Sequence, residues 1–125
     1  DVYPKNNFSA SEKLQIALTM AESLADIHGF EGGRIYHGDT HIEQWLLAPD
    51  GTIKLNDFNL AREPEWNVKT NQYCDYHSEY GGTYRSPEEF TGDPQDEAVD
   101  VYGYANNIYT LLTGLWPYYD ADYRG

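Results

Sequence analysis

The chain has 125 residues, a formal net charge of −13 and one cysteine, Cys74. This length fits a single compact domain. The negative charge argues against nucleic acid or an acidic membrane face as the main partner, because both are polyanions. One cysteine excludes an internal disulfide and a cysteine zinc cluster, and no apolar run is long enough to span a membrane, so we expect a cytoplasmic protein.

The first predicted element is a helix over residues 9–28. Ser9 and Glu12 have the S-x-x-E spacing of a capping box, in which each side chain satisfies a free backbone amide at the helix start. Apolar residues then recur at helical spacing as far as Ile27, and Gly29 is a typical stop.

A hairpin is predicted next, with strands over residues 45–48 and 52–56. The intervening Pro49-Asp50-Gly51 favours a turn, since Pro presets φ and Gly accepts a positive φ. The preceding residues 30–44 have the glycines of a loop. The following residues 59–95 are polar and aromatic with little periodicity, which predicts a long functional loop.

The last predicted element is a helix over residues 96–113, which Gly114 and Pro117 end. The order of helix, loop, hairpin, long loop and helix predicts a mainly helical α+β domain with a small antiparallel hairpin.

Three short segments carry the candidate chemistry. They are His37-Gly38-Asp39-Thr40-His41-Ile42-Glu43-Gln44 before the hairpin, Asp57-Phe58-Asn59 after it, and Ser86-Pro87-Glu88 ahead of the last helix. Phosphoryl transfer needs one carboxylate to orient the attacking hydroxyl and another to hold the metal on the phosphates. Asp39 and Asp57 lie at opposite ends of the hairpin, so its ladder can bring both to one edge. Aspartates beside a hairpin are also common turn formers and caps.

Taken together, the order and spacing of these segments resemble the protein kinase family. The catalytic loop of that family reads H-R-D-x-x-x-x-N, its metal loop D-F-G and the end of its activation segment A-P-E. Asp39 and Asp57 are 18 positions apart and Glu88 and Asp100 are 12 apart, as is usual in the family. The resemblance continues through Asp100-Val101-Tyr102-Gly103-Tyr104 and Leu111-Leu112-Thr113-Gly114-Leu115-Trp116-Pro117, which are similar to the two ends of the family's central helix.

The resemblance covers nearly the whole chain, and the helix at 9–28 matches the one before the catalytic loop. Residues 1–125 would then be part of a kinase domain, a C-terminal lobe without its N-terminal lobe. The implied cofactors are ATP and Mg²⁺, and the implied partners are the missing lobe and a protein substrate with Ser/Thr hydroxyls, with no nucleic acid and no membrane. The wording of residues 57–59, 84–90 and 106–117 also resembles kinase-like proteins of diatoms and related algae.

Five residues receive roles in catalysis or cofactor binding from the resemblance. Asp39 would be the catalytic base, and Asp57 would bind the magnesium that bridges the phosphates. His41 stands where the usual Lys touches the transferred phosphate, and it is a weaker electrostatic clamp. Gln44 stands where an Asn holds the second magnesium, with the same amide on one more methylene. Leu46 would form the floor under adenine.

Further residues receive structural roles. His37 and Phe58 would belong to the hydrophobic stack that reports the active state, and Asp100 would brace the catalytic loop through its backbone amides. Glu88 would form a buried ion pair with an Arg beyond residue 125. Asn59 replaces the Gly after Asp-Phe, in a turn where we expect a positive φ.

Departures from the family pattern leave other functions open. Nothing in the chain resembles the glycine-rich loop or the strand lysine of the N-terminal lobe, so we expect the chain alone to be inactive and the larger protein to be the kinase. Gly38, Gln44 and Asn59 instead favour a pseudokinase, which uses the fold as a binding scaffold. A small-molecule kinase of the aminoglycoside or choline type shares the H-G-D-x-H loop at residues 37–41, but Ser86-Pro87-Glu88 argues against it.

Overall fold

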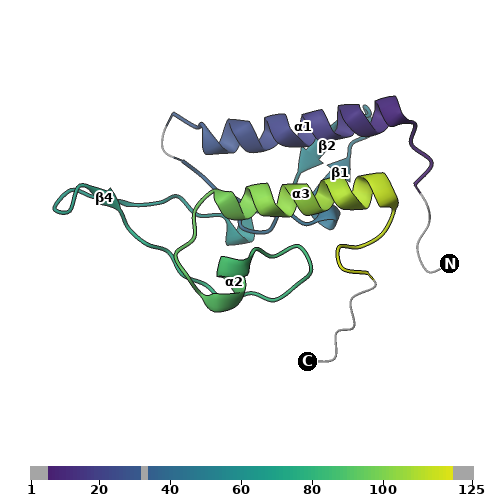
Figure 1. Cartoon of the computed structure of the whole chain (residues 1–125). Coiled ribbons are helices and arrows are strands. Elements are labelled where there is room, and N and C mark those ends of the chain that lie inside the picture. The colour runs from purple at the N-terminus through teal and green to yellow at the C-terminus, as the bar shows by residue number, and fades with distance from the viewer. Residues whose placement is uncertain (1–5, 32–33, 120–125) are drawn as a thin grey trace.

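A computed structural model describes residues 6–31 and 34–119, and the structural statements below concern those residues. They form a small α+β domain (Figure 1) in which two long helices lie side by side and a short hairpin packs against the first of them. The elements in chain order are α1 (Ala10–His28), β1 (Trp45–Leu47), β2 (Ile53–Leu55), β3 (Trp66–Asn67), β4 (Gln72–Tyr73), α2 (Pro87–Thr91) and α3 (Ala98–Thr113), with 3₁₀ turns at Ile42–Gln44 and Phe58–Leu60.

The predicted capping box at the start of α1 is confirmed. The backbone N–H of Ser9 donates to Glu12 Oε2 at 2.7 Å, and the N–H of Glu12 donates to Ser9 Oγ at 3.3 Å. The helix ends where expected, because the N–H of Gly29 caps it by donating to the carbonyl of Ala25. Met20 and Leu24 of α1 form the buried centre of the core together with Trp45. Partly buried apolar side chains pack around these three: Ile16, Ile27, Ile42, Ile53, Leu55 and Tyr104.

The predicted hairpin is confirmed as an antiparallel pair in which Leu46 lies opposite Lys54. Its strands are shorter than the predicted 45–48 and 52–56, because Ala48 and Thr52 flank the turn and the N–H of Asn56 donates to the carbonyl of Gln44 ahead of β1. Ala48 N–H donates to the Thr52 carbonyl at 2.8 Å, and Gly51 takes the expected positive φ of 84°. The turn therefore sets the register that fixes which residues follow each strand.

The long stretch predicted as a loop over residues 59–95 contains structure that the sequence reasoning missed. It holds a second antiparallel hairpin, β3–β4, in which the rings of Trp66 and Tyr73 lie 4.9 Å apart edge to face. It also holds α2, which begins with a second capping box formed by Ser86 and Glu89. Two-residue strands are too short to produce a detectable alternation, so periodicity could not reveal them.

The last helix, α3, begins at Ala98 rather than at the predicted Asp96. The carboxylate of Asp96 accepts a hydrogen bond from the N–H of Ala98 at 2.8 Å, so Asp96 serves as a capping group ahead of the helix. The helix ends as predicted, with Gly114 at φ 73°. Within the described ranges, no helix combines the length and apolarity needed to cross a bilayer.

Candidate active site

The loop between α1 and β1 is held in place by a buried carboxylate of α3. Asp100 has no exposed side-chain area, and its Oδ2 accepts from the backbone N–H of His37 at 2.6 Å while Oδ1 accepts from that of Gly38 at 2.8 Å. His28, the last residue of α1, completes the arrangement with Nε2 2.8 Å from Asp100 Oδ2. A carboxylate that binds two consecutive amides holds the backbone just before Asp39 in one conformation.

A second set of contacts seats the next residue of the loop on the same helix. Thr40 is buried, and its hydroxyl donates to the carbonyl of Asp100 at 3.3 Å. Asn107, also fully buried, donates from Nδ2 to the carbonyl of Thr40 at 2.5 Å. The close approach requires Gly103, because a Cβ at that position would lie 2.2 Å from Thr40 Oγ1. The loop thus rests directly on the α3 backbone.

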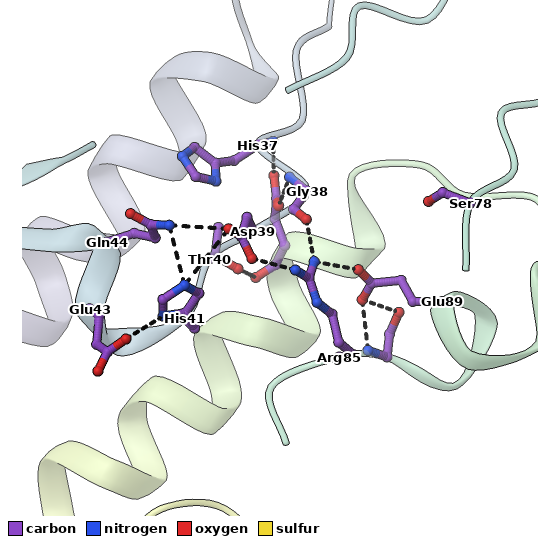
Figure 2. Close-up of polar contacts among 12 residues, drawn as sticks. His37, Gly38, Asp39, Thr40, His41, Glu43, Gln44, Ser78, Arg85 and Glu89 are labelled. Carbon is purple, nitrogen blue, oxygen red and sulfur yellow. Dashed lines mark hydrogen bonds and ion pairs between the residues drawn. The ribbon is translucent and has the colours of Figure 1, made fainter. Parts of the chain in front are cut away.

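The side chain of Asp39 is held at both of its oxygens, as Figure 2 shows. Oδ2 accepts from Gln44 Nε2 at 3.1 Å, and Oδ1 pairs with Arg85 Nη2 at 2.5 Å. His41 lies next to the same carboxylate, with Nε2 3.7 Å from Oδ2 and 3.2 Å from Gln44 Nε2. Asp39 keeps 14% of its side-chain area exposed, so it is accessible from one side.

Arg85 and Glu89 are site residues that the sequence reasoning did not identify. Arg85 Nη1 also donates to the carbonyl of Gly38 at 2.5 Å and to Glu89 Oε1 at 2.9 Å. Glu89 is 3% exposed, whereas the neighbouring Glu88 is half-buried. The ion pair expected for Glu88 stays a prediction, because its Arg was expected beyond residue 125. The missed signal was the S-x-x-E spacing of Ser86 and Glu89, the same as at the start of α1.

The other predicted carboxylate follows β2. Asp57 is exposed and takes a positive φ of 60°, which an Asp tolerates better than most residues. The positive φ that we expected at Asn59 is therefore misplaced by two residues, since Asn59 lies inside the 3₁₀ turn Phe58–Leu60. Just before Asp57, the N–H of Asn56 donates to the carbonyl of Gln44 at 2.9 Å. This bond ties the segment after the hairpin to the one before it.

His37 and Phe58 connect the same two segments through their side chains. Their rings meet edge to face with centroids 4.8 Å apart, and His37 Nε2 lies 2.8 Å from the carbonyl of Asn56. His37 is fully buried while Phe58 is 46% exposed, and Leu46 on β1 is 48% exposed. Phe58 and Leu46 thus each keep about half of their apolar surface available for contact with another part of the protein or with a ligand.

A cleft of about 330 Å³ opens beside Asp39. The lining residues include Asp39, His41, Ile42, Glu43, Gly81, Gly82, Thr83, Tyr84, Arg85 and Trp116. The Tyr84 hydroxyl lies 2.8 Å from Thr110 Oγ1, and burial raises the pKa of the Tyr84 phenol. Tyr84 therefore lines the cleft as an uncharged side chain. The loop 81–85 and the loop that carries Asp39 thus face each other across a space large enough for a side chain.

Asp57 and Gln44 each offer an oxygen atom of the kind that Mg²⁺ prefers as a ligand. In the described part of the chain, no group of three or more His, Cys, Asp or Glu side chains could hold a metal ion alone. Mg²⁺ is usually bound by one or two protein ligands together with phosphate oxygens and water. The exposed carboxylate of Asp57 accepts no hydrogen bond from the described residues, and Gln44 bonds there through its nitrogen, which leaves its amide oxygen for a hard cation.

The chain belongs to the protein kinase domain family, which it matches over residues 2–124. It is 33% identical over 99 residues to the serine/threonine-protein kinase AtPK1/AtPK6 of Arabidopsis thaliana, covering 78% of this chain and 20% of that protein. It is 31% identical over 117 residues to the Arabidopsis serine/threonine-protein kinase STY17, covering 91% and 19%.

A third relative is calcium/calmodulin-dependent protein kinase type II of Caenorhabditis elegans, 30% identical over 127 aligned positions that cover 98% of this chain and 16% of that protein. The chain therefore spans about a fifth or less of the length of these relatives. Family membership was predicted from the three motif segments and their spacing, and that prediction is confirmed.

Proposed function

We propose that the protein containing this chain is a protein kinase that transfers the γ-phosphoryl group of ATP to Ser or Thr hydroxyls of a protein substrate. The observation that carries the proposal is the partly exposed Asp39 carboxylate, held at both oxygens and facing a cleft. Residues 1–125 would form part of the C-terminal lobe of the kinase domain. The N-terminal lobe would be its partner and would complete the nucleotide site.

Asp39 would orient the attacking hydroxyl and accept its proton. An ionised carboxylate has about four lone-pair sites on its two oxygens, and the bonds from Gln44 and Arg85 use one on each. A lone pair on each oxygen is left for a hydroxyl in the cleft. Because the loop backbone is fixed by Asp100 and the side chain by its two donors, little conformational freedom is lost when the substrate binds.

Asp57 and Gln44 would hold Mg²⁺ with the phosphates, and the exposed side chain of Leu46 would contact adenine. Bound Mg²⁺ would supply neutralisation of the phosphate charge. His41 lies beside Asp39 and 3.9 Å from Glu43, at the edge of the cleft where it could reach a phosphate oxygen. Its ring is a weaker cation than a lysine, so we assign it a supporting role.

The proposed substrate class draws on the relatives, two of which are named as serine/threonine kinases. A nucleotide-binding scaffold without transfer activity is the second candidate. It is favoured by Gly38, Gln44 and Asn59, which depart from the family pattern in the catalytic and metal loops. The two candidates predict opposite results when transfer is measured.

The test uses the full-length protein, purified with its native upstream segment, radiolabelled ATP and arrays of Ser, Thr and Tyr peptides. We expect transfer to Ser or Thr peptides, and we expect Asp39→Asn to lower kcat by about 100- to 10,000-fold, because the change removes the charge that accepts the proton. Asp57→Asn should abolish Mg²⁺-dependent turnover, since a hard cation prefers a carboxylate ligand.

The matched control is Asp26→Asn, the same substitution at an exposed position of α1 away from the cleft, and it should leave kcat unchanged. Binding of ATP without transfer in the unsubstituted protein would refute the kinase and favour the scaffold. Transfer to choline or an aminoglycoside, with none to peptides, would identify a small-molecule kinase instead.

A further inference from the structure

We propose that Arg85 is a positioning residue for phosphoryl transfer, which holds Asp39 in its working orientation from the opposite side of the cleft. The inference rests on the proposed function, because it assigns Asp39 the role of base. Arg85 lies 46 positions along the chain from Asp39, in the loop that precedes α2. Figure 2 shows its guanidinium reaching across to the loop that carries Asp39.

The guanidinium of Arg85 binds three acceptors with its two terminal nitrogens. Nη2 donates to Asp39 Oδ1, and Nη1 donates to both the carbonyl of Gly38 and Glu89 Oε1. Two of these acceptors belong to neighbouring residues of the loop, so the planar group fixes the Asp39 carboxylate relative to its own backbone. A lysine has one nitrogen and lacks this rigid fork, so it could not make the same pattern.

Arg85 is itself held in place, which a positioning residue requires. Glu89 Oε2 accepts from the N–H and the hydroxyl of Ser86 at 2.8 and 2.9 Å, so the capping box of α2 orients the carboxylate that anchors Arg85. The ring of Tyr80 lies under the guanidinium at 5.0 Å. The start of α2 therefore orients Glu89, Glu89 orients Arg85, and Arg85 orients Asp39.

Burial makes this arrangement sensitive to the loss of the cation. The side chains of Asp39 and Arg85 are each 14% exposed and that of Glu89 is 4% exposed, so the three charges are largely removed from water. Without Arg85, two carboxylates would remain close together with no permanent cation between them. We therefore expect Asp39 to turn away toward solvent when Arg85 is removed, and the reacting geometry to be lost.

The contact between Arg85 and Asp39 also connects the proposed base to the wall of the cleft. Tyr84 lines the cleft next to Arg85 in the chain, so the residue that orients Asp39 also fixes the segment that faces the substrate. A displaced base costs rate rather than nucleotide affinity, because Asp39 is not assigned any contact with ATP. Arg85 should consequently affect kcat much more than the KM for ATP.

The experiment measures peptide phosphorylation by the full-length protein carrying Arg85→Ala or Arg85→Lys. We expect Arg85→Ala to lower kcat by about 100-fold, with the KM for ATP within about threefold of the unsubstituted protein. Methylguanidine added to Arg85→Ala should restore at least about tenfold of the lost kcat, because it supplies the missing fork. The kcat of Arg85→Lys should lie between those of Arg85→Ala and the unsubstituted protein, because lysine keeps the positive charge but lacks the fork geometry.

The matched control is Arg34→Ala, which breaks an Arg–Glu pair of 2.6 Å to Glu97 away from the cleft. Neither its kcat nor its response to methylguanidine should differ from the unsubstituted protein. Trp fluorescence and circular dichroism check that each variant is folded. If Arg85→Ala does not fold, Arg85→Lys carries the test, and its kcat should fall at least about tenfold with little change in the KM for ATP.

The outcomes separate the two proposals. An active protein in which Arg85→Ala is as fast as, or faster than, the unsubstituted enzyme overturns the positioning role alone, and a faster variant would identify Arg85 as a block on Asp39. An active protein whose Arg85→Ala loses kcat without any response to methylguanidine also overturns it, because the loss is then a general structural one. A protein with no transfer activity overturns the proposed function and this inference with it.

Discussion

Substitution of Gly103 by Ala tests how closely the loop that carries Asp39 rests on α3. A Cβ at this position would lie 2.2 Å from the hydroxyl oxygen of Thr40, about 0.8 Å inside the 3.0 Å below which a neighbour must move. Thr40 is buried, and its hydroxyl is used in a hydrogen bond to the Asp100 carbonyl, so it cannot move without loss. The clash therefore reaches the residue next to Asp39.

The expected magnitude follows from three contributions. Strain from the extra methyl group costs about 1–3 kcal/mol, and loss of the Thr40 hydrogen bond costs about 1 kcal/mol. Replacing Gly by Ala inside a helix returns about 1 kcal/mol through helix propensity. Gly103→Ala should thus lower the free energy of unfolding by about 1–3 kcal/mol. It should also lower kcat, because a displaced Thr40 moves the adjacent Asp39 with it.

In a protein that already carries Thr40→Ala, the effect of Gly103→Ala on stability should have the opposite sign. In Thr40→Ala the hydroxyl is gone, and the atoms nearest the new Cβ are then the Cβ and the carbonyl oxygen of the substituted residue, both at 3.4 Å, an ordinary contact. There Gly103→Ala should stabilise the protein by up to about 1 kcal/mol. Ala105→Gly, at an exposed position of the same helix, measures the propensity effect by itself and should cost about 1 kcal/mol.

The assay is urea unfolding followed by tryptophan fluorescence, to which the buried Trp45 contributes, with peptide phosphorylation measured in parallel. If Gly103→Ala changes the free energy of unfolding equally in the unsubstituted protein and in the Thr40→Ala variant, the steric reasoning is wrong and the contact between loop and helix is looser than described.

Three further predictions concern other parts of the site and the fold. Asp100→Asn should cost roughly 3 kcal/mol in urea unfolding, because an amide nitrogen would then face one of the backbone N–H donors that the carboxylate now binds. Gln44→Leu should lower kcat about tenfold or more in steady-state assays, since Asp39 Oδ2 loses its donor. Hydrogen bonds from the backbone and then the side chain of Ser9 lower the pKa of Glu12. That stabilisation is present above the ordinary pKa of Glu12, which is 4.5, and is lost as the pH falls through the lowered value, so the stability difference between the unsubstituted protein and Glu12→Gln should shrink as the pH falls below that ordinary pKa.

Local features of the sequence determined the elements that depend on neighbouring residues. The S-x-x-E box at Ser9 started α1, the Pro49-Asp50-Gly51 turn closed the first hairpin, and Gly114 ended α3. These signals work because caps and turns satisfy backbone groups within three or four positions, so no tertiary contact is needed to recognise them. The order of the motif segments also identified the family.

Only the tertiary structure decided that Arg85 contacts Asp39. Arg85 reaches it across 46 positions, and nothing in the spacing of the chain marks that pairing. Glu89 is the buried partner of Arg85, because the capping box of α2 turns this glutamate inward. The fit of Thr40 against Gly103 likewise exists only once the loop and α3 are packed, since steric complementarity depends on distances that no local pattern encodes.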